Sequence, residues 1–182
     1  MGARKLAFCD NQEIMSFARS FPPIAAPDAE ILILGSMPGQ ASLNACEYYA
    51  HPRNAFWPIM SELLGIDKNS AYAQRIETLQ SARVALWDVL YSCVRPGSLD
   101  ADIEPDSLLA NDLSGFLQQH PGIKRIFFNG TKAESCFRRH IATTLTAGSI
   151  ICQRLPSTSP AHAALNFEQK LNAWRIILAE RH

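Results

Sequence analysis

The stretch Ile31-Leu32-Ile33-Leu34-Gly35-Ser36-Met37-Pro38-Gly39 joins a short apolar run to a turn rich in glycine and proline. Its hydrophobicity is continuous rather than alternating, which is typical of a strand buried on both faces of a parallel sheet. Three further apolar runs end in a turn or helix-start signal, at residues 84–87, 126–128 and 150–152. Together the four runs predict a central, mainly parallel sheet of four strands.

Helical patterns separate or follow these runs. Apolar residues recur at spacings of three and four over 56–63, and Gly65 is placed to end that helix. A second helix is expected over 131–140, which begins with a Thr-x-x-Glu capping box, and a third over about 166–180, with one apolar stripe. Alternating strands and helices predict an α/β fold, a three-layer α/β/α sandwich with right-handed crossovers.

The composition fits one ordinary domain. Of 182 residues, 47% are hydrophobic and 19% charged, and basic and acidic residues are equal at 17 each, which excludes a disordered chain or a basic scaffold. No stretch approaches the roughly 18 apolar residues of a membrane span, and the five cysteines lack C-x-x-C spacing. We therefore expect a single domain over 1–182, cytoplasmic and monomeric, with reduced thiols and no membrane association.

The charges are unevenly distributed along the chain. Residues 85–113 contain six acidic side chains and one basic, whereas residues 114–154 contain six basic and one acidic. A polyanionic partner could therefore find a basic face on a neutral protein, although both runs also fit solvated surfaces of helices and loops. For such a partner, the acidic run 100–106 must point away from the binding face.

Four loops follow the four predicted strands: 35–54, 88–106, 129–131 and 155–163. In open parallel sheets, ligands bind beyond the carboxyl ends of the strands. We therefore look for the functional site in these loops.

The first and last of these loops carry distinctive sequences. The first begins G-S-M-P-G at Gly35 and ends Y-Y-A-H-P-R-N-A-F-W at Trp57, and its glycines allow the backbone of Gly35, Ser36 and Met37 to come close to a ligand. The last reads L-P-S-T-S-P-A from Leu155, a stiff loop of small hydroxyl residues suited to phosphate oxygens, or simply a turn into the last helix.

These paired motifs resemble the uracil-DNA glycosylase superfamily, and most nearly its hypoxanthine-DNA glycosylase branch, the sixth family. The resemblance implies a DNA repair enzyme that acts on double-stranded DNA containing deaminated bases. It would flip the base, chiefly hypoxanthine with uracil as a minor substrate, and hydrolyse its N-glycosidic bond. Neither motif contains a lysine that could form a Schiff base with the sugar, so we expect a monofunctional enzyme that leaves an abasic site. We expect no cofactor and no metal, because the cysteine spacing does not match the iron–sulfur members.

The resemblance also implies which residue positions the catalytic water. Most of the superfamily has Asp or Asn at the third position of the first loop, where this chain has Met37, and a thioether cannot orient water. In the sixth family the Asn of H-P-x-N is thought to take over this role, which points to Asn54. Its neutral amide would orient the water rather than deprotonate it. The alternative is that Asn54 only caps the following helix.

Two further residues are candidates for contacting the base, together with the turn at Gly35, Ser36 and Met37. Tyr49 matches the aromatic residue that stacks on the flipped base in related enzymes, whereas Tyr48 is expected in the core. Asp88 ends the second strand where the uracil enzymes carry a base-reading Asn. Ionised, it would accept from hypoxanthine N1–H; the alternative is that it caps a turn.

The second motif has Leu155 where the superfamily commonly has His or Asn, so an imidazole that would stabilise the leaving base is absent there. Ser157 and Ser159 are candidates for phosphate contact, and Thr158 to His162 for the wedge beside the vacated stack. Lys132 could bind phosphate at a helix start, although a plain strand-to-helix turn is the rival interpretation.

Two other functions remain open. Loss of the water-positioning residue at Met37 would suit a catalytically silent nucleic-acid-binding module that keeps the pocket. The first loop alone would also suit an α/β nucleotide or phosphoester hydrolase, but no P-loop, G-x-G-x-x-G or acidic metal cluster supports it.

Overall fold

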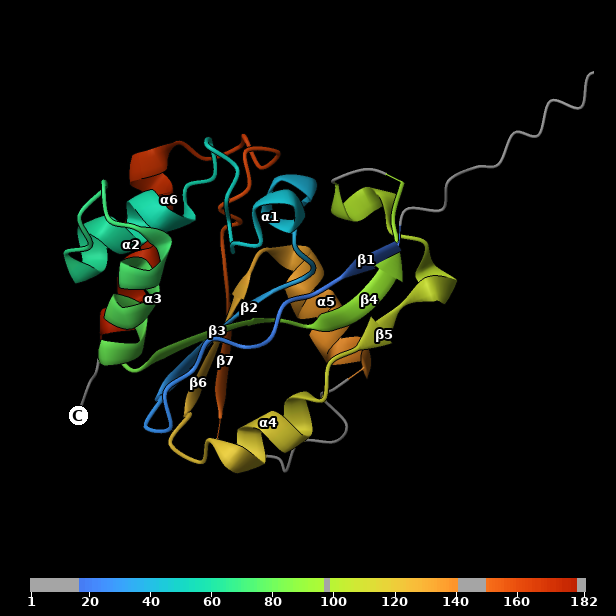
Figure 1. Cartoon of the computed structure of the whole chain (residues 1–182), viewed down its shortest axis with the longest axis horizontal. Coiled ribbons are helices and arrows are strands. Elements are labelled where there is room, and N and C mark those ends of the chain that lie inside the picture. The colour runs from blue at the N-terminus through green and yellow to red at the C-terminus, as the bar shows by residue number, and fades with distance from the viewer. Residues whose placement is uncertain (1–16, 97–98, 141–149, 180–182) are drawn as a thin grey trace, which may run out of the picture.

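The computed structural model describes residues 17–96, 99–140 and 150–179. Its larger sheet has four parallel strands in the order β3-β2-β6-β7 (Figure 1). The strands are β2 (Ile31–Gly35), β3 (Val84–Asp88), β6 (Arg125–Asn129) and β7 (Ile151–Leu155). The predicted four-stranded parallel sheet is confirmed.

Helices cover both faces of this sheet (Figure 1). One layer contains α2 (Phe56–Leu64), α3 (Tyr72–Ser81) and α6 (Phe167–Trp174), whose apolar side chains share a core with Ile31 and Ile33. The other contains α4 (Leu113–Gln119) and α5 (Thr131–His140), which share a core with Leu32 and Leu34. Successive side chains of β2 thus enter opposite cores, as a strand's period of two requires. The predicted three-layer α/β/α sandwich is confirmed.

The expectation that all four strands are buried on both faces is wrong for β7. Only Leu155 is buried in this strand, and Ile151 is 63% exposed. β7 lies at the edge of the sheet beside β6, whereas β2 lies between two strands and is buried throughout. Its apolar start therefore reflects strand propensity rather than burial.

A second, antiparallel sheet was not expected from the sequence. It has the order β1-β4-β5 and consists of β1 (Phe17–Arg19), β4 (Leu90–Val94) and β5 (Leu109–Ala110). β4 follows β3 after a single residue, so the chain passes from one sheet into the other where a loop was predicted. Two short 3₁₀ helices, η1 (Asp100–Asp102) and η2 (Pro105–Ser107), precede β5.

The predicted helices are present, with two differences in detail. α2 ends at Gly65, whose φ of 71° is the left-handed conformation expected there. In α5 the capping box is not formed, because Thr131 is already helical and the Glu134 carboxylate pairs with Arg138 and Arg154. The last helix is shorter than predicted, because after Trp174 the chain continues as the 3₁₀ helix η3 (Arg175–Leu178).

Candidate active site

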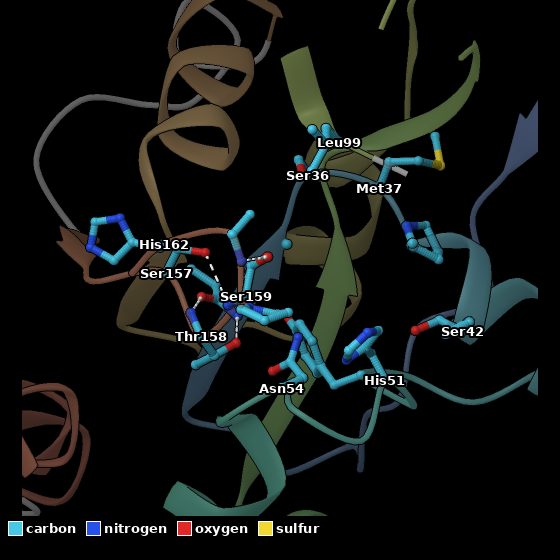
Figure 2. Close-up of a pocket in the computed structure, with 18 of the residues that line it drawn as sticks. Ser36, Met37, Ser42, His51, Asn54, Leu99, Ser157, Thr158, Ser159 and His162 are labelled. Atoms are coloured by element: carbon cyan, nitrogen blue, oxygen red, sulfur yellow. Dashed lines mark hydrogen bonds between the residues drawn. The ribbon is translucent and has the colours of Figure 1, made fainter. Parts of the chain in front are cut away.

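A cavity of about 670 Å³ lies where β2, β3, β6 and β7 end, in the size range of small-molecule sites. All four predicted loops contribute to its lining, and so does the start of α1 (Gln40–Ala45). Figure 2 shows side chains from the first and last loops facing this hollow from opposite walls. The carboxyl edge of the sheet is therefore the place where the two sequence motifs meet.

Ten of the eleven predicted site residues line this cavity. They are Gly35, Ser36, Met37, Tyr49, Asn54, Asp88, Ser157, Thr158, Ser159 and His162. The exception is Lys132, the second residue of α5, which is not part of the lining. The lining also includes Arg53, an exposed cation that the sequence interpretation did not single out.

The innermost wall is formed where Gly35 meets two polar side chains. A Cβ atom on Gly35 would lie 2.4 Å from Asp88 Oδ1 and 3.2 Å from the hydroxyl of Tyr49. Only glycine therefore lets these groups approach the end of β2. Asp88 is 3% exposed, and Val89, the next residue, bonds through its backbone N–H to the carbonyl of Gly35.

The two adjacent tyrosines have different environments. Tyr49 has a positive φ of 56°, lines the cavity and stacks on Phe56, with ring centroids 4.1 Å apart. Tyr48 is 3% exposed and packs in the core beside Phe21, as expected. Burial, and secondarily the carboxylate of Asp88, raises the pKa of Tyr48 far above its usual value, so this phenol stays protonated.

Asn54 makes the bond to the start of the helix that the sequence left open as an alternative, and it also lines the cavity. Its Oδ1 accepts a hydrogen bond of 3.0 Å from the Phe56 N–H, so it does stabilise the start of α2. This bond uses one of the two lone pairs of Oδ1. Within the described part of the chain the Nδ2 group has no hydrogen-bond partner. The capping bond therefore fixes the side chain and leaves its amide group available at the cavity wall (Figure 2).

Thr158 joins three loops from a fully buried position. Its backbone N–H donates to Asn129 Oδ1 at 2.8 Å, and Asn129 Nδ2 donates back to Thr158 Oγ1 at 2.9 Å. Its carbonyl accepts from the Ala55 N–H at 2.9 Å, next to Asn54. Thr158 is 0% exposed, so the predicted DNA contact does not fit its burial. The pairing with Asn129 was missed because residues 29 apart give no sequence pattern.

The two serines of the last loop are stiffened by local bonds. Ser157 Oγ accepts from the Ser159 N–H and Ser159 Oγ accepts from the Ala161 N–H, both at 3.2 Å. Each hydroxyl keeps its own proton for donation. A Cβ on Gly130 would lie 2.9 Å from that of Ser157, so Gly130 allows β6 and the last loop to pack closely.

The second loop departs from expectation at one place. Arg95, a cation in a loop, is 2% exposed and donates a hydrogen bond of 2.5 Å to the carbonyl of Pro38, so it stabilises the first loop rather than facing solvent. Leu99 and Ala101 line the cavity. None of the acidic side chains Asp102, Glu104 and Asp106 is part of the lining.

Neither metal ligands nor a membrane helix is found in the described ranges. Residues 17–96, 99–140 and 150–179 contain no cluster of three or more His, Cys, Asp or Glu side chains suited to a metal. No helix in these ranges is both long and apolar enough to cross a bilayer. The described cysteines, Cys46, Cys93, Cys136 and Cys152, form no disulfide with one another.

Comparisons with known proteins show the family of this chain. The family model for the uracil DNA glycosylase superfamily matches residues 22–179. The chain belongs to this superfamily. Its members hydrolyse N-glycosyl bonds, so the chain is a glycosylase, and the cavity is its candidate active site.

Individual relatives support the same assignment. Two proteins named hypoxanthine DNA glycosylase, from Methanosarcina barkeri and Methanosarcina acetivorans, are 37% and 38% identical over 116 residues, which is 63% of this chain and 72% of each relative. A Methanosarcina acetivorans protein solved by solution NMR as a candidate uracil DNA glycosylase matches with a TM-score of 0.73 and 30% identity, covering 90% of this chain and 99% of that one. The superfamily glycosylase therefore has relatives that are similar in sequence and fold.

Proposed function

We propose that this glycosylase removes hypoxanthine from double-stranded DNA by hydrolysing the N-glycosidic bond of a nucleotide flipped into the cavity, with uracil as a lesser substrate. The observation that carries the proposal is the meeting of Tyr49, Asp88 and Asn54 in one cavity, in a chain whose curated relatives are named hypoxanthine DNA glycosylase. An enzyme that acts on a base must take it out of the stack, at a cost of about a few kcal/mol that is smallest for damaged pairs.

Each of the three side chains has a role in this reaction. Tyr49 offers a ring for stacking, which contributes roughly 1–3 kcal/mol per base. An ionised Asp88 accepts from N1–H of hypoxanthine, a proton that adenine lacks at that position. Asn54 orients a water molecule towards C1′ of the sugar through its amide.

The bond changes balance without a cofactor. The C1′–N9 bond breaks and its electron pair goes to the base, which leaves an oxocarbenium-like sugar. The oriented water adds its oxygen to C1′ and loses a proton to solvent, while the base takes up a proton. The products are free hypoxanthine and an abasic site. No lysine is among the described residues of the lining, which supports hydrolysis without a Schiff base.

The buried thioether of Met37 favours one second candidate, a silent binding module, because it occupies the position where related enzymes orient water. One experiment separates the two functions. Purified protein is incubated with labelled duplexes that contain inosine, uracil, xanthine or normal bases, and alkali then breaks any abasic sites. We expect cleavage of the inosine strand first. Inosine strands that stay intact while the protein binds them would establish the silent module instead.

A further inference from the structure

Departure of the base from the sugar requires a group that stabilises the negative charge on the base. As the C1′–N9 bond breaks, negative charge builds up on the base, and a preorganised hydrogen-bond donor lowers the barrier. Leu155 is 2% exposed and apolar, so the second motif provides no side-chain donor at that position. The cavity lining includes two imidazoles, His51 and His162, and neither has a role in the reaction steps given above.

His51 is the imidazole whose orientation is fixed. Its Nδ1 accepts a hydrogen bond of 3.1 Å from the Arg53 N–H, and its carbonyl accepts from the Asn54 N–H at 2.8 Å. Pro52, between them, has no N–H and a restricted φ. By contrast, the ring of His162 has no hydrogen-bond partner in the part of the chain that the structure describes. Figure 2 shows His51 beside Asn54 at the same hollow.

The Arg53 bond also determines where the ring proton lies. A backbone N–H is always a donor, so Nδ1 must be the unprotonated acceptor, and a neutral imidazole then carries its proton on Nε2. His51 therefore presents an N–H donor of fixed tautomer, one turn away from the amide that orients water.

We propose that His51 is a catalytic residue of the glycosylase, donating its Nε2–H to an acceptor of the leaving base and stabilising the charge that develops there. The assignment rests on the proposed function. No proton is transferred in the step: the C1′–N9 electron pair moves onto the base, the Nε2–H stays on His51, and the base is protonated later from solvent. Because His51 lines the same cavity as Tyr49 and Asp88, the ligand we assign to it is the base rather than a phosphate at the rim.

Two variants separate the donor from the loop anchor. His51→Asn keeps an oxygen at the position of Nδ1, so it still accepts from the Arg53 N–H, but it has nothing at Nε2. His51→Gln keeps an N–H group two bonds beyond Cγ, as in the imidazole, but has no acceptor at the Nδ1 position. The first therefore preserves the loop and removes the donor, and the second does the reverse.

The test uses single-turnover cleavage of an inosine duplex at saturating enzyme. Binding is measured separately on a duplex with 2′-fluoro-2′-deoxyinosine, whose fluorine prevents bond cleavage. We expect His51→Asn to cut about 100-fold more slowly than wild type, as for loss of one donor to a developing charge. Its affinity for the analogue and its thermal midpoint should stay at wild-type values. His51→Gln should cut at least about tenfold faster than His51→Asn, because it retains part of that donor.

Three results would overturn the assignment. If His51→Asn cuts as fast as wild type, the ring only anchors the loop. If it binds more weakly with a shallower salt dependence while the saturated rate is unchanged, the ring contacts phosphate. If both variants lose the same rate, the donor position is irrelevant. A wild-type enzyme that cuts no inosine strand would instead refute the proposed function, and the assignment would fall with it.

Discussion

The reciprocal pair of hydrogen bonds between Asn129 and Thr158 is expected to hold the active site together, and removing it should cost both stability and rate. Asn129→Ala leaves the N–H and hydroxyl of Thr158 without partners at a residue that is 0% exposed. An unsatisfied buried polar group costs about 1–3 kcal/mol, so we expect a loss of about 2–4 kcal/mol in the free energy of unfolding.

Thr158→Val is the smaller perturbation of the same pair. It preserves volume and the backbone bond to Asn129 Oδ1, and leaves only Asn129 Nδ2 without its acceptor. We expect a loss of about 1–2 kcal/mol. The double variant lacks both partners of the Nδ2–Oγ1 bond. Its loss in free energy of unfolding should therefore be about 1 kcal/mol smaller than the two single losses added together, the coupling expected between residues in contact.

Urea unfolding measures these differences, provided that the slope of unfolding free energy against urea concentration is the same in every variant. Inosine cleavage reports the effect on the site. The rate should fall with stability, because the Thr158 carbonyl also accepts from Ala55 next to Asn54. Thr78→Val is the matched control, since that hydroxyl only bonds back to Gln74 within α3; it should change stability by less than about 0.5 kcal/mol. Strict additivity in the cycle, or Asn129→Ala as stable as the control, would refute the reasoning.

Three further predictions concern single positions. Gly35→Ala should fold but cut inosine slowly in the alkali assay, because its Cβ would lie 2.4 Å from Asp88 Oδ1 and must displace that carboxylate; a wild-type rate would show that Asp88 need not stay there. Asn54→Ala should lower the rate about 10²–10⁴-fold and stability by about 0.5–2 kcal/mol through the lost cap, whereas Asn54→Ser, with an oxygen for the cap, should lose mainly rate. Burial lowers the pKa of Lys170, so Lys170→Met should unfold at higher urea than wild type near neutral pH. That difference should shrink as pH rises towards the usual lysine value, because the wild-type amine is then neutral in both states.

Sequence reasoning was most successful where one strand and its turn decide the local structure. The apolar run at 31–34 predicted β2, and Gly65 predicted the end of α2, because both depend on neighbouring residues only. The small sheet was missed because β4 begins one residue after β3 and pairs with β1, which lies more than seventy positions earlier in the chain. Such a pairing is set by tertiary packing, which leaves no periodic pattern in the sequence.

In the candidate site, too, local motifs were predictable and long-range contacts were not. Spacing and resemblance identified Asn54, Tyr49 and Asp88 as candidates, and all three line one cavity in the structure. The burial of Thr158 and of Arg95 could not be predicted, because a hydroxyl or guanidinium in a loop is usually exposed. Both side chains bond to distant backbone or amide groups, so their roles depend on contacts between loops rather than on the motifs themselves.

The arrangement of charge around the cavity bears on how the enzyme would discriminate damaged from normal DNA. Non-specific affinity comes mainly from cations that replace counterions on phosphates. Among the described residues of the cavity lining, Arg53 is the single lysine or arginine. Phosphate contacts around this cavity should therefore contribute little binding free energy. Under the proposed function, most of the binding energy must come from the base in the cavity. Undamaged duplex would then be released readily, and a neutral chain would suit an enzyme that has to search long stretches of normal DNA.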